Sequence, residues 1–409
     1  GTLSNPGNWI PAISVSDTDG AVLVSLGNVT ATVFNVLPSP RADINAPAAW
    51  DVMTGANGIR VGVIDTGIDY THPDLAGNIW TNPGETGLDA NGNDKRTNGI
   101  DDDGDGYVDD WHGWNFDGDN NNPMDDYFHG THCAGTIGGV GNNGVGVAGV
   151  DWNVSLVPLK FLSTDGGGAT SDAIEAIYYA TKIGVRLTSN SWGGGALDTG
   201  LQDAIADAAA HGILFVAAAG NGGSDGVGDN NDTTPTYPGG YSCPNIIAVA
   251  ATDRGDKLAP FSNYGANSVD LGAPGVNIYS TFPTYMTGAM MKSGAPTHYA
   301  IISGTSMATP HVAGACALLM SLSPTIPFMD VKAQLLDTAD RIPALAGRCV
   351  SGGRLNLGHA VTNLAARLAP CLQFAGVEAN DTTGGNGDGL INPGETVNLV
   401  VTLESAITP

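Results

Sequence analysis

One serine in the chain stands where covalent chemistry is favoured. Ser306 follows a Gly-Thr pair and opens the run 307–320, whose many small residues predict a helix packed closely against a sheet. The N–H groups and the dipole at a helix N-terminus stabilise negative charge. A serine oxygen at such a position can attack a carbonyl group while its own N–H helps to hold the resulting oxyanion. The structural alternative is an N-cap serine without chemistry.

Two further segments offer partners for such a nucleophile. Asp65 follows the apolar run 59–64, which is typical of a buried strand in a parallel sheet, where ligands lie at the carboxyl ends of strands. His129 and His132 stand in a Gly-rich entry to another small-residue helix. A catalytic histidine needs a carboxylate to orient it, and Asp65 is a candidate. The His-x-x-His spacing is a weak zinc signal, because it has no intervening glutamate and no third ligand nearby.

An asparagine is the fourth candidate. The run 213–218 predicts a strand that leads through an Ala-Gly pair into Asn221. A side-chain amide at the end of a central strand can donate a hydrogen bond to an oxyanion. Asparagine before glycine is also typical of a simple turn, so this residue alone leaves both roles open.

An acidic segment interrupts the chain between residues 78 and 126. Within it, alternate aspartates have the spacing of oxygen ligands, and Gly106 allows the sharp turn that would aim the next carbonyl inward. The glutamate that closes such a loop in an EF-hand is absent, so an aspartate must close the shell. The predicted calcium ligands are Asp101, Asp103, Asp105, the Tyr107 carbonyl, and Asp109 or Asp110. The alternative is a merely solvated acidic loop.

Composition narrows the class of protein. The formal net charge is -26, from 41 acidic and 15 basic residues, which argues against a nucleic-acid partner. No apolar run reaches the roughly 18 residues that a membrane helix needs, so no membrane insertion is expected. Five cysteines exclude a fully paired disulfide framework. Cys349 and Cys371 could pair, whereas Cys133 and Cys316 lie in apolar runs and are expected to be buried thiols.

The elements that position these residues alternate between strands and helices. Besides 59–64 and 213–218, strands are predicted at 154–162, 185–190, 246–251, 268–271 and 299–302. Helices are predicted at 46–54, 171–184, 201–211 and 330–339, with a last one ending near 368. This βαβα rhythm predicts an α/β protein with a parallel sheet and helices on both faces.

Three regions are expected along the chain. Residues 1–40 form an N-terminal extension, which contains a possible hairpin around a Gly-Asn turn or is a propeptide remnant. Residues 41–370 form the main domain, with the acidic insert 78–126. Residues 371–409 are read as a linker and the first strand, 397–403, of a truncated C-terminal β-sandwich.

Three motifs together resemble the subtilisin-like serine proteases. They are Val-Ile-Asp-Thr-Gly-Ile at 63–68, His-Gly-Thr-His at 129–132 and Gly-Thr-Ser-Met-Ala-Thr-Pro-His at 304–311, in the order Asp, His, Ser. The resemblance extends over about residues 44–364, and the cysteine after the second motif is similar to the thermitase and proteinase K branches. It implies a three-layer α/β fold with a largely parallel sheet of roughly seven strands.

The resemblance also implies roles for individual residues. Ser306 would be the nucleophile, His129 rather than His132 the general base and then acid, and Asp65 the carboxylate that orients the imidazole. Asn221 and the Ser306 N–H would form the oxyanion hole. The implied substrate-binding residues are Ser191, Trp192, Gly193 and Gly194 in an extended strand, with Gly220 and Thr236 at the specificity pocket.

Further calcium sites follow from the same resemblance. Asp74 matches the carboxylate of the family's tight site, and Asn143 is the expected side-chain ligand from the loop that completes it. Asp117 and Asp119 lie where the thermitase branch has another site, with an offset of one residue. The ligands predicted for the acidic insert are inferred from spacing alone. Counted together with the sites that the resemblance implies, two or more Ca²⁺ sites are expected.

The function implied is that of a secreted, calcium-stabilised serine endopeptidase acting on polypeptides as a monomer. No acidic cluster marks the pocket, so broad or apolar and aromatic specificity is expected rather than that of a narrow processing protease. The alternative is a catalytically silent, calcium-dependent binding or adhesion protein on the same fold. The intact set of Asp65, His129, Ser306 and Asn221 argues against it.

Overall fold

The computed structural model describes residues 42–368, 372–380 and 398–405. The chain divides into two compact units between Thr362 and Asn363, and each unit is described by itself. The hairpin predicted within residues 1–40 lies outside the described residues.

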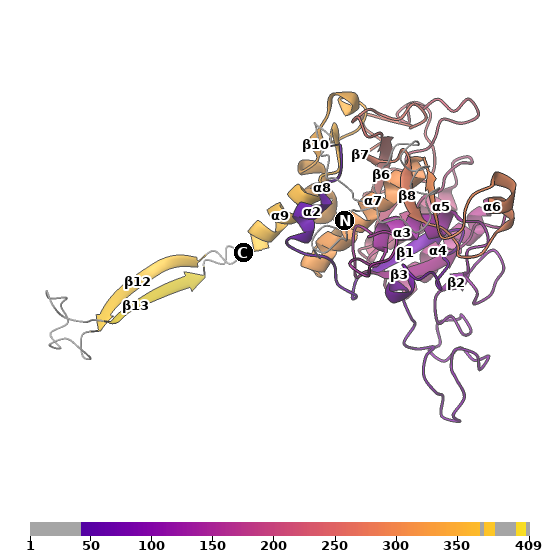
Figure 1. The fold of residues 1–409 in the computed structure, drawn as a ribbon, viewed down its shortest axis with the longest axis horizontal. Coiled ribbons are helices and arrows are strands. Elements are labelled where there is room, and N and C mark those ends of the chain that lie inside the picture. The colour runs from indigo at the N-terminus through magenta and orange to yellow at the C-terminus, as the bar shows by residue number, and fades with distance from the viewer. Residues whose placement is uncertain (1–41, 369–371, 381–397, 406–409) are drawn as a thin grey trace. The chain divides into compact units, whose positions relative to one another are not determined.

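A nine-stranded sheet in the order β10-β11-β7-β6-β5-β4-β1-β3-β2 forms the centre of the first unit (Figure 1). Its strands pair in parallel, except that β10 pairs with β11 in antiparallel fashion. The resemblance implied about seven strands. Six of the nine have four or more residues, and the two-residue strands β2, β10 and β11 extend the edges. The bounds are β1 Arg60–Asp65, β2 Trp114–Asn115, β3 Ser155–Lys160, β4 Leu187–Asn190, β5 Leu214–Ala218, β6 Ile246–Thr252, β7 Leu271–Pro274, β10 Asp340–Arg341 and β11 Gly353–Arg354.

The central strands are buried from end to end. Every residue of β4, β5 and β6 is buried, and so is every residue of β1 except its first. Continuous apolar runs of this kind need cover on both faces, as parallel sheets have. Several predicted boundaries were wrong. The strand predicted at 268–271, for example, begins only at Leu271, because Val269 N–H bonds to Gly265 O and closes a turn first.

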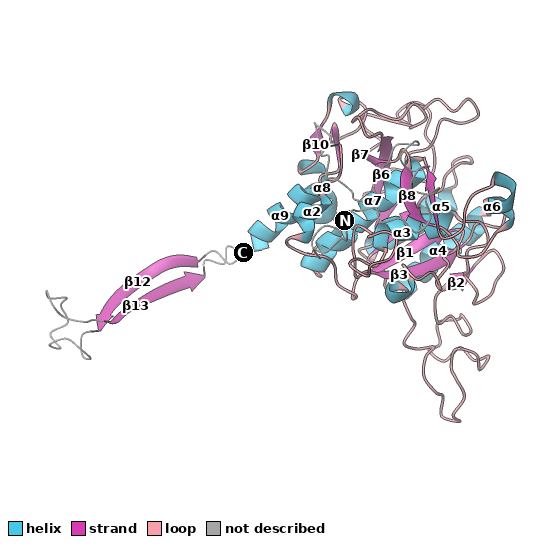
Figure 2. Cartoon of the chain, viewed as in Figure 1, coloured by secondary structure: helices cyan, strands magenta, loops and turns pink. Residues whose placement is uncertain are grey.

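Helices cover the sheet in two pairs (Figures 1 and 2). Helices α3 (His129–Gly138) and α7 (Thr305–Leu322) contact each other and the sheet, as do α4 (Thr170–Lys182) and α5 (Thr199–Ala210). This is the three-layer α/β fold with a largely parallel sheet that the sequence predicted. The remaining helices are α2 Ala46–Trp50, α6 Gly288–Ser293, α8 Phe328–Asp337 and α9 Leu357–Leu368, with the short 3-10 turns η1 Ala76–Asn78 and η2 Pro343–Leu345.

A small antiparallel pair leads into α7. Strand β8 (Ile278–Thr281) pairs with β9 (Tyr299–Ile302), and β9 has the bounds that the sequence predicted. Gly304 N–H then bonds to Gly275 O, which fixes the entry to the helix just before the nucleophile candidate.

The second unit contains an antiparallel pair of strands. Strand β12 (Leu372–Asn380) pairs with β13 (Asn398–Ser405), with an irregularity between Phe374 and Gly376. The sequence predicted 397–403 as the first strand of this region, and it is the second. The earlier strand was missed because its alternation of apolar residues slips by one position at this irregularity.

Candidate active site

The fold brings three of the four candidate residues to the ends of neighbouring elements. Asp65 is the last residue of β1, His129 the first of α3 and Ser306 the second of α7. Helix α3 contacts both α7 and β1. The carboxyl end of the strand and the two helix N-termini therefore meet at one edge of the structure.

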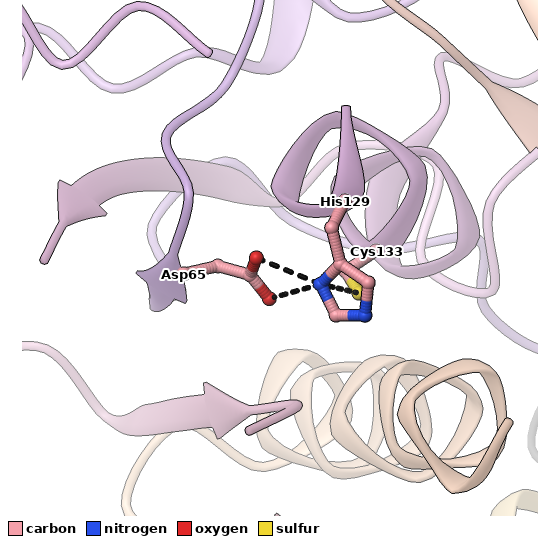
Figure 3. Close-up of side chains that lie close together, drawn as sticks. All are labelled: Asp65, His129 and Cys133. Carbon is pink, nitrogen blue, oxygen red and sulfur yellow. Dashed lines mark hydrogen bonds and ion pairs between the residues drawn. The ribbon is translucent and has the colours of Figure 1, made fainter. Parts of the chain in front are cut away.

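Asp65 and His129 are directly hydrogen-bonded (Figure 3). His129 Nδ1 lies 2.8 Å from Asp65 Oδ1 and 3.0 Å from Oδ2. The Asp65 side chain is 1% exposed and that of His129 is 19% exposed. The Asp65 carboxylate is therefore shielded from solvent, whereas the His129 imidazole is partly accessible. The Nδ1 atom of His129 is hydrogen-bonded to Asp65, and its Nε2 atom points away from Asp65.

Electrostatics at His129 favour the charged imidazole. Burial alone would lower the pKa of His129, but the Asp65 carboxylate and the Cys133 sulfur outweigh it, and the net effect raises the pKa well above its usual value. Cys133 Sγ lies 3.9 Å from His129 Nδ1 beneath the ring (Figure 3). The imidazolium that forms when His129 accepts a proton is thus stabilised.

The two histidines of the second motif have different surroundings. His132 is buried, and its Nε2 lies 3.0 Å from the Ile278 carbonyl oxygen. Burial lowers the pKa of His132 to about 3. The structure therefore brings His129, and not His132, to Asp65, and the two rings do not form the zinc pair that their spacing suggested.

A proline in α7 shapes the surroundings of Ser306. Pro310 has no N–H, so the Ser306 carbonyl lacks the usual partner four residues later. It accepts instead from Ser191 Oγ at 2.9 Å and Cys133 Sγ at 3.5 Å. The Ser306 hydroxyl in turn donates to the Ser191 backbone oxygen at 3.0 Å. Ser306 is thereby tied to the segment that follows β4, and its N–H is one of those that α7 leaves unpaired inside the helix.

Asn221 is oriented by the residue before Ser306. Its Oδ1 accepts from Thr305 N at 2.8 Å and from Thr305 Oγ1 at 3.0 Å. With the oxygen held, the Nδ2 group is the part of the amide left to donate. This arrangement suits an oxyanion donor better than a turn asparagine.

The expected substrate wall and pocket floor lie next to each other. Gly194 N–H bonds to the Tyr237 carbonyl at 2.9 Å, and Trp192 packs against Phe161 with ring centroids 4.8 Å apart. Gly220 has φ +111°, and a Cβ there would come within 3.2 Å of the Thr236 side chain. The four-residue segment from Ser191 and the residues at 220 and 236 thus form one continuous region beside Ser306.

The acidic insert gathers carboxylates into two groups that share Asp103. Glu85, Asp101 and Asp103 form one, and Asp103, Asp105 and Asp110 the other, with ligand oxygens all within 4.8 Å of one another in each. Glu85 Oε2 and Asp105 Oδ2 are buried and have no hydrogen-bond partner among the described residues. Burial raises the pKa of Glu85 and of Asp105, and that of Asp110 to about 7. Buried, unpaired carboxylate oxygens of this kind fit a hard cation such as Ca²⁺.

The structure separates the two residues between which the sequence could not choose. Asp109 has φ +57° and accepts from Gly99 N at 3.1 and 3.2 Å, so it lies outside both groups. Asp110 belongs to the second group. Tyr107 packs its ring on Trp114 and Tyr179. The sequence did not indicate Glu85 as a member of these groups. Glu85 precedes Asp101 by 16 residues, and no known ligand spacing includes it.

The remaining calcium candidates have two different outcomes. Asp74 is buried and meets Asn143, whose Nδ2 donates to Asp74 Oδ1 at 2.7 Å, while Val147 N donates to Oδ2 at 2.7 Å. An ion there would require the Asn143 amide to turn its oxygen inward. Asp117 and Asp119 are exposed and belong to no group of three ligand side chains within the described residues.

The chain is similar to several known proteins. A family model described as the subtilase family matches residues 56–375. Thermitase of Thermoactinomyces vulgaris is 37% identical over 318 residues, which is 78% of this chain and 93% of thermitase. Subtilisin DY of Bacillus licheniformis is 37% identical over 290 residues, or 70% of this chain and 85% of the subtilisin.

Two further matches extend the comparison. An extracellular protease of Xanthomonas campestris pv. campestris is 37% identical over 340 residues, and the match covers 79% of this chain but 54% of that longer protein. The solved structure of a cold adapted subtilisin-like serine proteinase superposes with a TM-score of 0.54 at 29% identity, over 73% of this chain and 89% of the other.

Proposed function

Because the chain belongs to the subtilase family and is a serine endopeptidase, we propose that it is a secreted, calcium-stabilised enzyme with Ser306, His129 and Asp65 as its catalytic triad. The observation that carries the assignment is the hydrogen bond of 2.8 Å between Asp65 Oδ1 and His129 Nδ1, at the edge where α3 and α7 begin. The family is the one that the three sequence motifs predicted.

The proposed reaction is acyl transfer in two steps. Ser306 Oγ attacks the carbonyl carbon of the scissile peptide bond as its proton moves to His129 Nε2, and Asp65 stabilises the imidazolium. Asn221 Nδ2 and the Ser306 N–H stabilise the oxyanion. His129 then gives the proton to the leaving amine, and the C–N bond breaks. Water attacks the acyl-enzyme in the same way and restores Ser306.

The proposed substrate strand is the segment from Ser191 to Gly194. An extended peptide would lie along it and place one side chain between Gly193, Gly220 and Thr236, a form of β-augmentation. Glycine and threonine offer shape and no charge at these positions. We therefore propose a broad or apolar and aromatic side-chain preference, with polypeptides as substrates and a monomer as the working unit.

Localisation and calcium complete the proposal. The Xanthomonas relative is named an extracellular protease, which supports secretion. Within the described residues, the structure has no helix that is both long and apolar enough to cross a membrane. Calcium would be held by the two groups around Asp103, where it would neutralise mutual repulsion, and a second site would use Asp74 and Asn143.

A direct test combines labelling with cleavage. A fluorophosphonate probe should attach to Ser306, located by mass spectrometry, and a peptide library should be cleaved after apolar or aromatic residues. Adding a chelator should reduce the cleavage rate by loosening the insert. A protein that neither labels nor cleaves would instead fit the silent binding protein.

Asn221→Leu tests the oxyanion assignment. Leucine keeps the volume and removes the donor, so kcat should fall by about two to three orders of magnitude with little change in KM, the size measured for this donor in subtilisin. Steady-state kinetics on a peptide anilide would measure both constants. A change confined to KM would assign Asn221 to a turn role.

Asp103→Ala combined with Asp105→Ala tests the insert. Asp103 belongs to both acidic groups, so the double variant should lose its ion there. Loss of binding at a hundredfold excess of calcium over Kd removes about 2.7 kcal/mol, or about 5 °C in Tm. Calorimetry in calcium and in chelator would measure the difference.

The matched control is Asp117→Ala combined with Asp119→Ala, which removes the same charge from exposed positions of the same insert. Its Tm in calcium should stay within about 1 °C of the wild type. Equal Tm values for the two double variants and the wild type would make the insert a solvated acidic loop.

A further inference from the structure

Asp125 is a buried carboxylate that the proposed chemistry does not use. Its side chain is 0% exposed. Oδ1 accepts from Thr66 Oγ1 at 2.8 Å and from Tyr127 N at 3.0 Å. Oδ2 accepts from Thr131 N at 2.9 Å and from Thr131 Oγ1 at 2.6 Å. One carboxylate therefore binds the residue after Asp65 and the residue two positions after His129.

Thr66 transmits this contact to the triad. Its hydroxyl donates to Asp125 and accepts from Gly130 N at 2.9 Å, and its N–H bonds to Asp65 Oδ1 at 2.7 Å. The contact needs a close approach, since a Cβ on Gly130 would lie 2.1 Å from the Gly67 oxygen. The turn after β1 and the first turn of α3 are thus held by a short chain of hydrogen bonds.

We propose that Asp125 is a positioning residue, whose carboxylate holds these two turns together and so keeps Asp65 within hydrogen-bond reach of His129. Asp65 and His129 are 64 positions apart, with the acidic insert between them. A displacement of about 1 Å between catalytic groups can reduce the rate by about 10². The inference extends the proposed function and depends on the triad assignment.

A purely structural role would be served better by another side chain. Burial raises the pKa of Asp125 to about 6, so the folded state disfavours the charged form relative to the unfolded chain. Above that pH, keeping the carboxylate ionised opposes folding. A neutral residue would suit stability, whereas a carboxylate that accepts hydrogen bonds from both catalytic turns suits positioning.

Asp125→Asn is the test variant. Each oxygen of Asp125 accepts a hydrogen bond from one backbone N–H. In either orientation, the NH₂ group of an asparagine would face one of these donors, Tyr127 N or Thr131 N, and could not accept from it. We expect kcat to fall by about 10², with KM within about twofold of the wild type. The rate of fluorophosphonate labelling, which needs the same His129 and Ser306, should fall by the same factor.

Asp69→Asn is the matched control. Asp69 is also 0% exposed and accepts four hydrogen bonds, from the N and Oγ1 atoms of Thr71 and of Thr284. Its carboxylate does not join the two catalytic turns. Its kcat should stay within about threefold of the wild type. Equal losses of kcat in both variants would overturn the proposal.

Thr66→Val provides a second route, which keeps the Asp125 charge. It should lower kcat as well. Both substitutions disrupt the same hydrogen bond, from Thr66 Oγ1 to Asp125 Oδ1. In the double variant with Asp125→Asn, kcat should therefore fall by less than the product of the two single reductions. If Asp125→Asn fails to fold, Thr66→Val alone decides. A kcat within threefold of wild type in Thr66→Val, or in a folded Asp125→Asn of lowered Tm, would make the role structural only. Failure of the wild type to label at Ser306 would instead refute the proposed function.

Discussion

Ser306→Ala is expected to lower kcat by about six orders of magnitude, the size measured for loss of the nucleophile in subtilisin. The reason is chemical: without Oγ no acyl-enzyme forms, and only the binding region and the oxyanion donors remain. Folding should be nearly unaffected, because the substitution removes a single hydrogen bond, from Ser306 Oγ to the Ser191 carbonyl oxygen at 3.0 Å. Kinetics, calorimetry and fluorophosphonate labelling would measure the three consequences.

Ser303→Ala is the control for this experiment. Ser303 is exposed, lies three positions earlier, and its hydroxyl accepts from Asn277 N at 2.8 Å. It should label and cleave like the wild type. Near wild-type turnover in Ser306→Ala would remove Ser306 from the mechanism, and a loss of Tm as large as the loss of activity would point to a folding defect.

Asp65→Asn is expected to lower kcat by about four orders of magnitude, as for the matching residue in subtilisin. An asparagine keeps the size of the side chain but can hold His129 in the wrong tautomer, and it no longer stabilises the imidazolium. The variant should also move the pH profile. His129 must be neutral to accept a proton, so activity is lost as the pH falls through the pKa of His129.

The direction of that shift follows from the charge. The Asp65 carboxylate raises the pKa of His129, so its removal should lower the pKa and let residual activity persist to lower pH. The acid limb of kcat/KM, compared between wild type and variant, would measure it. An unchanged or upward-shifted limb would contradict the assignment of Asp65 as the partner of His129.

Local pattern was enough to predict the central elements of the fold. Strands such as β5 and β6 are continuous apolar runs, and the helices that begin at His129 and Thr305 are rich in small residues. The candidates at 65, 129 and 306 could also be found from the sequence, because each lies at the end of a strand or at the start of a helix. Such boundaries are where composition changes most abruptly.

Contacts between distant segments could not be predicted in the same way. Glu85 joins a group of carboxylates only because the insert folds back on itself, and Asp125 meets Thr66 across 59 positions. Asp109 has a positive φ angle and accepts hydrogen bonds from Gly99 N, whereas Asp110 joins the second acidic group. The irregular strand β12 was hidden because a shift of register breaks its period of two.

The predicted calcium ligands also show the difference between local sequence pattern and contacts in the folded chain. Spacing predicted Asp101, Asp103 and Asp105 as ligands, and the structure gathers these three aspartates into groups with Glu85 and Asp110. Asp117 and Asp119, which the resemblance suggested, belong to no such group within the described residues. Exposure does not separate the two sets, because Asp103 is exposed as well. The difference is that the groups around Asp103 contain buried carboxylate oxygens without a partner, on Glu85 and Asp105.

The part of the acidic insert between Trp80 and Trp114 is attached to one strand at both ends. Trp80 N–H bonds to Leu156 O, and β2 pairs with β3 through Trp114 and Leu159. This part of the insert is thus a closed loop on β3, outside the ladder that joins β1 to β3 and β4. A single cut within it would leave two polypeptides interleaved in one sheet, so the nicked protein would migrate as one particle until it is denatured.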